Sequence, residues 1–117
     1  MTEDSPTPDW WGLLETGPDA LGGGYDEPMR RLVAVARKTR LHKLHPFTSM
    51  NRLCFARTPW PFEDVQPGYV AFYPDGKYEV WRGGPYKDQS TCVLRTHDSA
   101  AAIATLLQQI LGEETTA

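Results

Sequence analysis

Apolar positions recur with a helical period in two stretches of the chain. In the first stretch, a stripe with i, i+3, i+4, i+7 spacing is formed by Met29, Leu32, Val33 and Ala36. We expect this helix to begin near Pro28, which suits a first helical turn, and to end before Pro46. In the second stretch, residues 100–111, the stripe is formed by Ile103, Leu106, Leu107, Ile110 and Leu111. Thr96 or Asp98 can cap the start of this helix, and Gly112 stands where a glycine commonly ends one.

Between these helices the period changes to two, which predicts short strands. Residues 52–57 read as a strand with Leu53 and Phe55 on one face and Cys54 on the other. Residues 91–95 predict a further strand on which Cys92 and Leu94 point the same way. The segment from Pro46 to the first of these strands is predicted to be a loop.

Two aromatic-rich runs, residues 69–73 and 77–82, flank Pro74-Asp75-Gly76, and these turn residues predict a hairpin. Alternation places four of its side chains toward the core, namely Val70, Phe72, Tyr78 and Val80. The opposite face is aromatic as well and carries Tyr69, Tyr73 and Trp81. We therefore treat that second face as a candidate contact surface.

The pattern predicts an α+β fold in the order helix, three- or four-stranded antiparallel sheet, helix, with both helices on one sheet face. We expect a single α+β domain over residues 25–112 and a frayed tail over 113–117. Residues 1–24 form an acidic, Trp-containing N-terminal segment that we expect to be partly disordered. Its apolar cluster, residues 10–14, is expected to dock on the domain, and docking on a partner is the alternative.

Composition supports one soluble domain. The chain has 117 residues, of which 40% are hydrophobic and 23% charged, which are ordinary globular values. No apolar stretch approaches the length that spans a bilayer and the acidic start does not resemble a signal peptide, so we expect a cytoplasmic protein with no membrane contact. The only cysteines, Cys54 and Cys92, are interpreted as reduced core thiols.

Charge is sorted into blocks although the net charge is only −3. Residues 1–27 contain seven acids and no Lys or Arg, whereas residues 28–57 contain eight basic residues and no acid. The seven-residue spacings Arg30 to Arg37 and Arg31 to Lys38 align basic side chains on the first helix. Either this face binds a partner or the acidic segment lies over it in the same molecule.

No catalytic, metal-binding or cofactor-binding motif is evident. His42 and His45 are three residues apart, but no nearby acid or Cys completes a metal site. Cys54 and His45 are a candidate pair of thiol nucleophile and base, yet Cys54 lies inside a predicted strand, where we expect it to be buried. The glycines at positions 22–24 follow no strand and precede no Lys-Ser or Lys-Thr, so we interpret them as a linker.

From the first helix onward the chain resembles an uncharacterised family of small actinobacterial proteins that are labelled as natural-product biosynthesis proteins. The resemblance covers roughly residues 25–112 and rests on a few short motifs, namely Arg40-Leu41, Leu44, Pro46-Phe47, Ser49, Leu53, Phe55 and Arg57, a Gly-containing hairpin, and a last strand leading into an Ala-rich helix. It implies the same α+β order. It supplies no catalytic residues to transfer.

The leading hypothesis is a non-enzymatic accessory protein that contacts a protein partner, in natural-product biosynthesis. Its predicted partner-binding residues are Arg30, Arg31, Arg37, Lys38, Tyr73 and Trp81. The second hypothesis is a nucleic-acid-binding protein that uses the basic first helix, because clustered Lys and Arg supply phosphate contacts. The third is a small biosynthetic enzyme with an unrecognised pocket. Oligomeric state is open.

Overall fold

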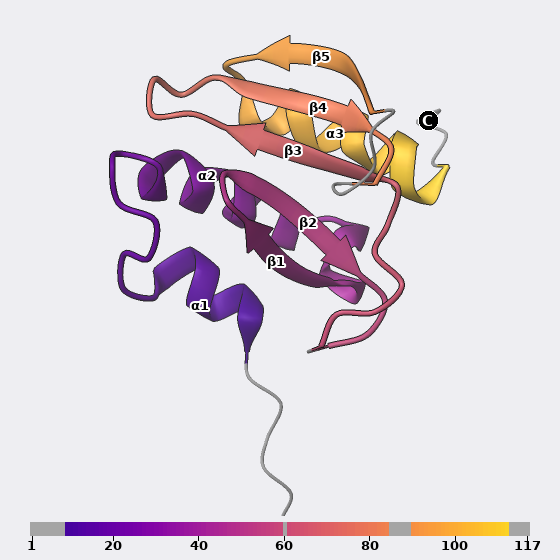
Figure 1. The fold of residues 1–117 in the computed structure, drawn as a ribbon, viewed down its shortest axis with the longest axis horizontal. Coiled ribbons are helices and arrows are strands. Elements are labelled where there is room, and N and C mark those ends of the chain that lie inside the picture. Colours follow the sequence, from indigo (N-terminus) through magenta and orange to yellow (C-terminus); the bar gives the residue numbers. More distant parts are fainter. Residues whose placement is uncertain (1–8, 60, 85–89, 113–117) are drawn as a thin grey trace, which may run out of the picture.

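A five-stranded antiparallel sheet with helices packed on it forms the framework of the protein (Figure 1). The structure, a computed structural model, describes residues 9–59, 61–84 and 90–112. The elements in chain order are α1 (Trp10–Thr16), α2 (Asp26–Arg37), the 3₁₀ helix η1 (Arg40–Lys43), β1 (His45–Ser49), β2 (Arg52–Ala56), β3 (Gly68–Phe72), β4 (Tyr78–Arg82), β5 (Thr91–Thr96) and α3 (Ser99–Leu111). Disorder was expected for residues 1–9; residues 1–8 lie outside the described residues, as does the tail 113–117 that was expected to fray, whereas Asp9 is described and accepts from Gly12 N–H as the N-cap of α1.

The sheet is a meander with the strand order β1-β2-β3-β4-β5. The fold class and the antiparallel sheet are as predicted, but the structure has five strands where the sequence predicted three or four. The strand that was missed is β1, which pairs with β2 from His45 opposite Ala56 to Ser49 opposite Arg52. Pro46 argued for a loop, but a proline is tolerated on an edge strand because no neighbour needs its missing N–H.

The predicted hairpin is present as β3 and β4. Tyr73 N–H donates to Lys77 O (3.1 Å), Gly76 N–H donates to Tyr73 O (2.9 Å), and Gly76 takes a φ of 90° that favours glycine. The register sets Val70 opposite Val80 and Phe72 opposite Tyr78. All four are fully buried, which confirms the predicted core-facing set.

The predicted orientation of Cys92 is wrong. Leu94 lies opposite Val80 and faces the core, whereas Cys92 lies opposite Trp81, which faces the other side of the sheet. The register shifts at a β-bulge between Val80 and Trp81: these neighbours pair with Leu94 and Cys92, so Val93 is an extra residue of β5, and Cys92 and Leu94 face opposite sides of the sheet. Cys92 is half-buried, and Cys54 is the fully buried thiol.

Both α2 and α3 pack on the same face of the sheet, as predicted, and Figure 1 shows them behind it. The core contains the predicted stripe of the first helix, two residues of the second stripe (Ile103 and Leu106), and the inward residues of β2, β3 and β4. Tyr78 OH donates to Pro28 O (2.9 Å) across this core. Asp98 accepts from Ala100 N–H (2.9 Å) at the start of α3, and Gly112 ends that helix with a φ of 61°.

The N-terminal segment docks on the domain from residue 9 onward. Trp11 Nε1–H donates to Leu44 O (3.1 Å), and the Trp11 ring lies 5.9 Å from that of Phe55. Asp26 at the start of α2 accepts from three backbone N–H groups of the preceding loop, those of Ala20 (2.9 Å), Leu21 (3.1 Å) and Gly22 (2.7 Å). These contacts hold α1 beside α2 and place it at the β1 end of the sheet.

Candidate functional site

The acidic segment lies against the basic helix. Arg37 lies 2.9 Å from Glu15 and 3.8 Å from Asp9. Arg30 lies 2.6 Å from Asp19 and also donates to Gly17 O (2.8 Å). The sequence left open whether the basic face binds a partner or is covered by the acidic segment of the same molecule. In the structure, acids of that segment lie against Arg30 and Arg37.

The other two basic residues predicted to bind a partner are more accessible. Arg31 pairs with Glu27 one helical turn away (3.2 Å), and both side chains are largely exposed. Lys38 is exposed at the C-terminal end of α2. Exposed pairs of this kind contribute only about 0–1 kcal/mol each, so a competing anion could displace them at little cost.

Tyr73 and Trp81 lie on the other face of the sheet, which no helix of the described residues covers; we call it the uncovered sheet face. Trp81 stacks on Tyr69, with ring centroids 6.2 Å apart and ring planes inclined by 8°. Tyr73 OH donates to Glu79 (2.8 Å), and the Lys77 ammonium lies 4.7 Å from the centroid of the Tyr73 ring. The predicted aromatic and basic residues therefore lie on opposite sides of the sheet and do not form one surface.

Glu79, on β4, is a buried carboxylate on this face. Besides the hydroxyl of Tyr73, it contacts Arg95 (3.1 Å) and Lys77 (3.8 Å). Burial raises its pKa, but the hydrogen bonds from Tyr73 and Arg95 and the charge of Lys77 outweigh burial, and the net pKa is lowered. Burial and the bond to Glu79 raise the pKa of Tyr73 to about 12. These partners stabilise the ionised form of Glu79 and balance its charge, so the cluster favours a structural role over that of a general base.

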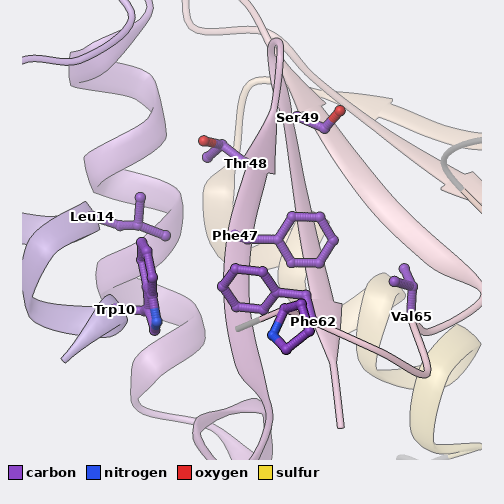
Figure 2. A pocket seen from close by; sticks show the side chains of 8 residues that line it. Trp10, Leu14, Phe47, Thr48, Ser49, Phe62 and Val65 are labelled. Carbon is purple, nitrogen blue, oxygen red and sulfur yellow. The ribbon is translucent and has the colours of Figure 1, made fainter. Parts of the chain in front are cut away.

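A groove with an apolar lining lies at the outer edge of β1. We call it the β1-edge groove; its volume is about 470 Å³ and its lining comprises Trp10, Leu14, Phe47, Thr48, Ser49, Pro61, Phe62 and Val65. Trp10 and Leu14, four residues apart on one face of α1, form one wall. Figure 2 shows Phe47 and Phe62 opposite this wall, with Thr48 and Ser49 at the upper end.

Aromatic contacts give this groove a defined shape. The Phe62 ring stacks on Phe47 (centroids 4.7 Å apart) and meets Trp10 edge-on (5.3 Å). Phe62 has a φ of 60°, a left-handed conformation that costs a bulky residue about 1–2 kcal/mol. Strain of this kind concentrates at functional sites, where the surrounding structure maintains it.

The loop that carries Phe62 is held at both ends. Thr58 Oγ1 accepts from Glu63 N–H (2.7 Å), and Phe62 N–H donates to Pro59 O (2.8 Å). Gln66 N–H donates to Phe55 O (2.8 Å), which fastens the end of the loop to β2. The groove is therefore preorganised, because its wall does not need to fold when a ligand arrives.

The backbone of β1 adds polar groups to the groove. Phe55 O accepts from Gln66 N–H, so the backbone groups of Phe55 point away from β1. Because these groups alternate along a strand, those of Arg52 and Cys54 point toward β1. In that register Phe47 and Ser49 bond to β2, and Thr48 directs its N–H and C=O outward. Among the described residues of the lining there is no Asp, Glu, His, Cys or Lys, so these residues offer no group for acid–base or nucleophilic catalysis.

A second hollow of about 460 Å³ gathers basic residues that the sequence analysis did not select. We call it the basic hollow; Arg40, Lys43, Leu44, Arg57 and Leu111 line it. It joins η1, the segment after β2 and the last turn of α3, which are distant in sequence. Only the tertiary structure brings these cations together, although all three belong to the basic block that the sequence displays.

The weaker candidates from the sequence do not form a site. His42 Nδ1 lies 2.7 Å from Thr39 O, and Cys54 is fully buried, where burial raises its pKa to about 12. In the parts of the chain that the structure describes, no three His, Cys, Asp or Glu side chains are grouped as metal ligands. None of the described helices is long and apolar enough to cross a membrane.

Comparison with known families places the chain in one of them. The sequence matches the family described as a family of unknown function, DUF6193, over residues 7–111. The chain belongs to this family. The DUF6193 match begins before α1, whereas the resemblance seen in the sequence began near residue 25, so the family region includes the segment that forms one wall of the groove. No curated protein and no solved structure matches the chain.

Proposed function

We propose that this DUF6193 domain is a non-enzymatic binding domain that holds an extended, apolar segment of a protein partner in the β1-edge groove. The observation that carries the proposal is a preorganised apolar groove that runs along the outer edge of β1, where no strand of the described residues pairs. Phe47 and Thr48 point to opposite faces of the sheet, yet both line the groove, so the groove follows the edge of the strand.

An extended segment fits this groove for two physical reasons. The outward N–H and C=O of Thr48 can pair with the backbone of an added strand. The apolar walls on either side, Trp10 with Leu14 and Phe62 with Val65, can receive side chains that alternate along that strand. Pro46 offers no N–H, so the pairing is short and the apolar side chains supply most of the affinity.

The residues predicted from the sequence do not line this groove, and because they lie on opposite sides of the sheet they enter the proposal as two separate surfaces. Lys38, Tyr73 and Trp81 are proposed to meet the partner outside the groove, and Arg30, Arg31 and Arg37 to do so after releasing the acids that they now hold. In line with the family resemblance, we propose a natural-product biosynthetic enzyme as the partner and the cytoplasm as the location.

Two alternatives remain distinct proposals with their own tests. Nucleic-acid binding by α2 predicts retention on heparin that falls steeply with added salt. The contacts of Arg30 and Arg37 with acidic residues of the chain oppose it. An enzymatic function predicts a pocket with convergent titratable groups, and the lining of the β1-edge groove opposes that reading.

Selection from a library of random linear peptides on the immobilised full chain tests the proposal. We expect enriched peptides with apolar residues at alternate positions, measured afterwards as labelled synthetic peptides by fluorescence anisotropy. Phe62→Asn should weaken binding by about thirtyfold, because it removes a central aromatic contact while asparagine tolerates the left-handed backbone. Thr48→Pro should weaken it about fivefold through loss of one backbone donor.

Leu13→Asn provides the matched control, because Leu13 is 49% exposed on α1 beside the groove-lining Leu14. Its affinity for the selected peptide should stay within about twofold of the unmodified chain. The proposal fails if no peptide is enriched, or if Phe62→Asn and Leu13→Asn bind the selected peptide equally well.

A further inference from the structure

We infer that the outward side of α3 is an interface for a second copy of this chain, in which the two α3 helices pack antiparallel. The inference goes beyond the proposed function and does not depend on it, because none of the described residues that line the β1-edge groove belongs to α3. Figure 1 shows α3 behind β3 and β4, and the helix contacts β3, β4 and β5 there. A dimer formed through the other side of α3 leaves the β1-edge groove of each copy open.

The helix α3 has two apolar sides, and the sheet covers one of them. Ile103 and Leu106 are buried in the core on that side. The other side carries a second row, which we call the α3 stripe; its members are Ala100, Ala104, Leu107 and Leu111. Leu107 is half-buried and the other three are exposed. The apolar pattern that the sequence shows in this helix is therefore wider than the core requires.

The α3 stripe has the spacing of a helix–helix seam. Its members follow one another at intervals of four, three and four residues, which keeps them in one row against a neighbouring helix. The whole of α3, Ser99–Leu111, contains no Asp, Glu, Lys or Arg. A surface helix ordinarily carries charge on its solvent side, as α2 does with Arg31 and Arg37. Because most of the stripe is exposed, the helix that it fits is not one of the described helices of the same chain.

The sizes of the side chains favour a second copy as the occupant. The N-terminal half of the stripe has small residues, Ala100 and Ala104, and the C-terminal half has large ones, Leu107 and Leu111. In an antiparallel pair related by a two-fold axis, Ala100 of one copy faces Leu111 of the second copy. By the same symmetry Ala104 faces Leu107. Each leucine then meets an alanine, so the side chains interdigitate and the helices approach closely.

The alternatives fit less well. A parallel pair would set alanine against alanine and leucine against leucine, which leaves gaps at one end and crowding at the other. A charged partner helix would lose hydration against a stripe that offers it no opposite charge. Two copies of the uncharged stripe meet without either cost.

Sedimentation equilibrium of the full chain tests the inference. One helix per copy gives an interface below the standard size of about 800 Å² per partner, so we expect a weak dimer with a dissociation constant on the order of 10–100 μM. Ala104→Glu should weaken the dimer at least about tenfold, because glutamate preserves the helix but places two like charges beside the two-fold axis. Leu13→Glu is the matched control, since it adds the same charge at an exposed position on α1, and its dissociation constant should stay within about twofold.

A mixture of two variants separates a loss of contact from a loss of folding. Ala104→Lys alone should be as monomeric as Ala104→Glu alone, for the same reason. An equimolar mixture of the two should dimerise more strongly than either variant, because opposite charges then lie beside the axis. Misfolded variants would not regain association on mixing.

Cross-linking tests the direction of the helices. In a Cys92→Ser background, which leaves the buried Cys54 as the remaining native thiol, Ala100→Cys and Leu111→Cys should form a disulfide with each other when mixed and oxidised. Neither should do so with itself, because antiparallel packing separates the identical positions by about 16 Å along the helix. A monomer at every concentration, equal association of Ala104→Glu and Leu13→Glu, or cross-linking of each variant with itself would each overturn the inference.

Discussion

The guanidinium of Arg37 lies 2.9 Å from the carboxylate of Glu15, and this contact joins the positive block of the chain to its negative block. The contact makes a testable prediction about the surface of α2. Glu15→Gln should raise the salt concentration at which the protein elutes from heparin, because it uncovers Arg37. The free energy of unfolding should fall by less than about 1 kcal/mol, since the pair is partly exposed.

Glu63→Gln is the control for that experiment, because it removes the same charge from an exposed loop position away from α2. Elution at the same salt concentration for both variants would show that overall charge, and not the uncovered arginine, governs retention.

The two tryptophans of α1 should differ in their contribution to stability. Trp11 Nε1–H donates to Leu44 O, whereas Trp10 Nε1 is buried and has no partner among the described residues. Trp11→Phe should therefore lower the free energy of unfolding by about 1 kcal/mol through the lost hydrogen bond, and by more than Trp10→Phe. Urea unfolding measures both values, and an equal or larger loss for Trp10→Phe would contradict the assignment.

Asp26 should make the protein sensitive to acid. Hydrogen bonds from the N–H groups of Ala20, Leu21 and Gly22, together with the charge of Arg30, outweigh burial and lower its pKa below the ordinary value of 3.8. A lowered folded-state pKa contributes stability above about pH 3.8, and that contribution is lost as the pH falls through the folded value.

Asp26→Asn should accordingly cost about 2 kcal/mol at pH 7 and less below pH 3, because one of the two acceptor atoms becomes a donor facing backbone N–H groups. Chemical unfolding at several pH values measures the difference. A difference that stays constant from pH 7 to pH 3 would show that the charge of Asp26 does not contribute.

The two thiols should react at different rates. Cys54 is fully buried with its pKa raised to about 12, while Cys92 is half-buried on the uncovered sheet face. Because the thiolate is the reactive form, one thiol should react with Ellman's reagent in the native protein and the second only after unfolding. Cys92→Ser should abolish the native-state reaction, and a reaction that survives this change would assign it to Cys54.

The helices and the central hairpin could be predicted because local signals and tertiary packing agree there. The stripe that begins at Met29 and the turn at Gly76 each specify one conformation without help from distant residues. The strand β1 could not be found in this way, because Pro46 is a strand breaker everywhere except at a sheet edge, and edge position is a property of the finished sheet.

The candidate sites were harder to predict, because both depend on distant segments. Phe62 lies in a Pro-containing loop, and only the packing of α1 turns its ring into the wall of a groove. Arg40 and Arg57 belong to the basic block, yet their seventeen-residue separation conceals that they share a hollow with Leu111. The predicted residues on α2 stood out by helical spacing, which does not show which acids lie against them.

Pro46 also affects how copies of this protein behave at high concentration. An unpaired edge strand can template the addition of identical strands, and long ladders of this kind lead to fibrils. Because the proline removes one donor from the outer edge of β1, the edge offers Thr48 as a single complete backbone pair. We therefore expect this edge to disfavour open-ended polymerisation, even if it can accept one short segment as proposed above.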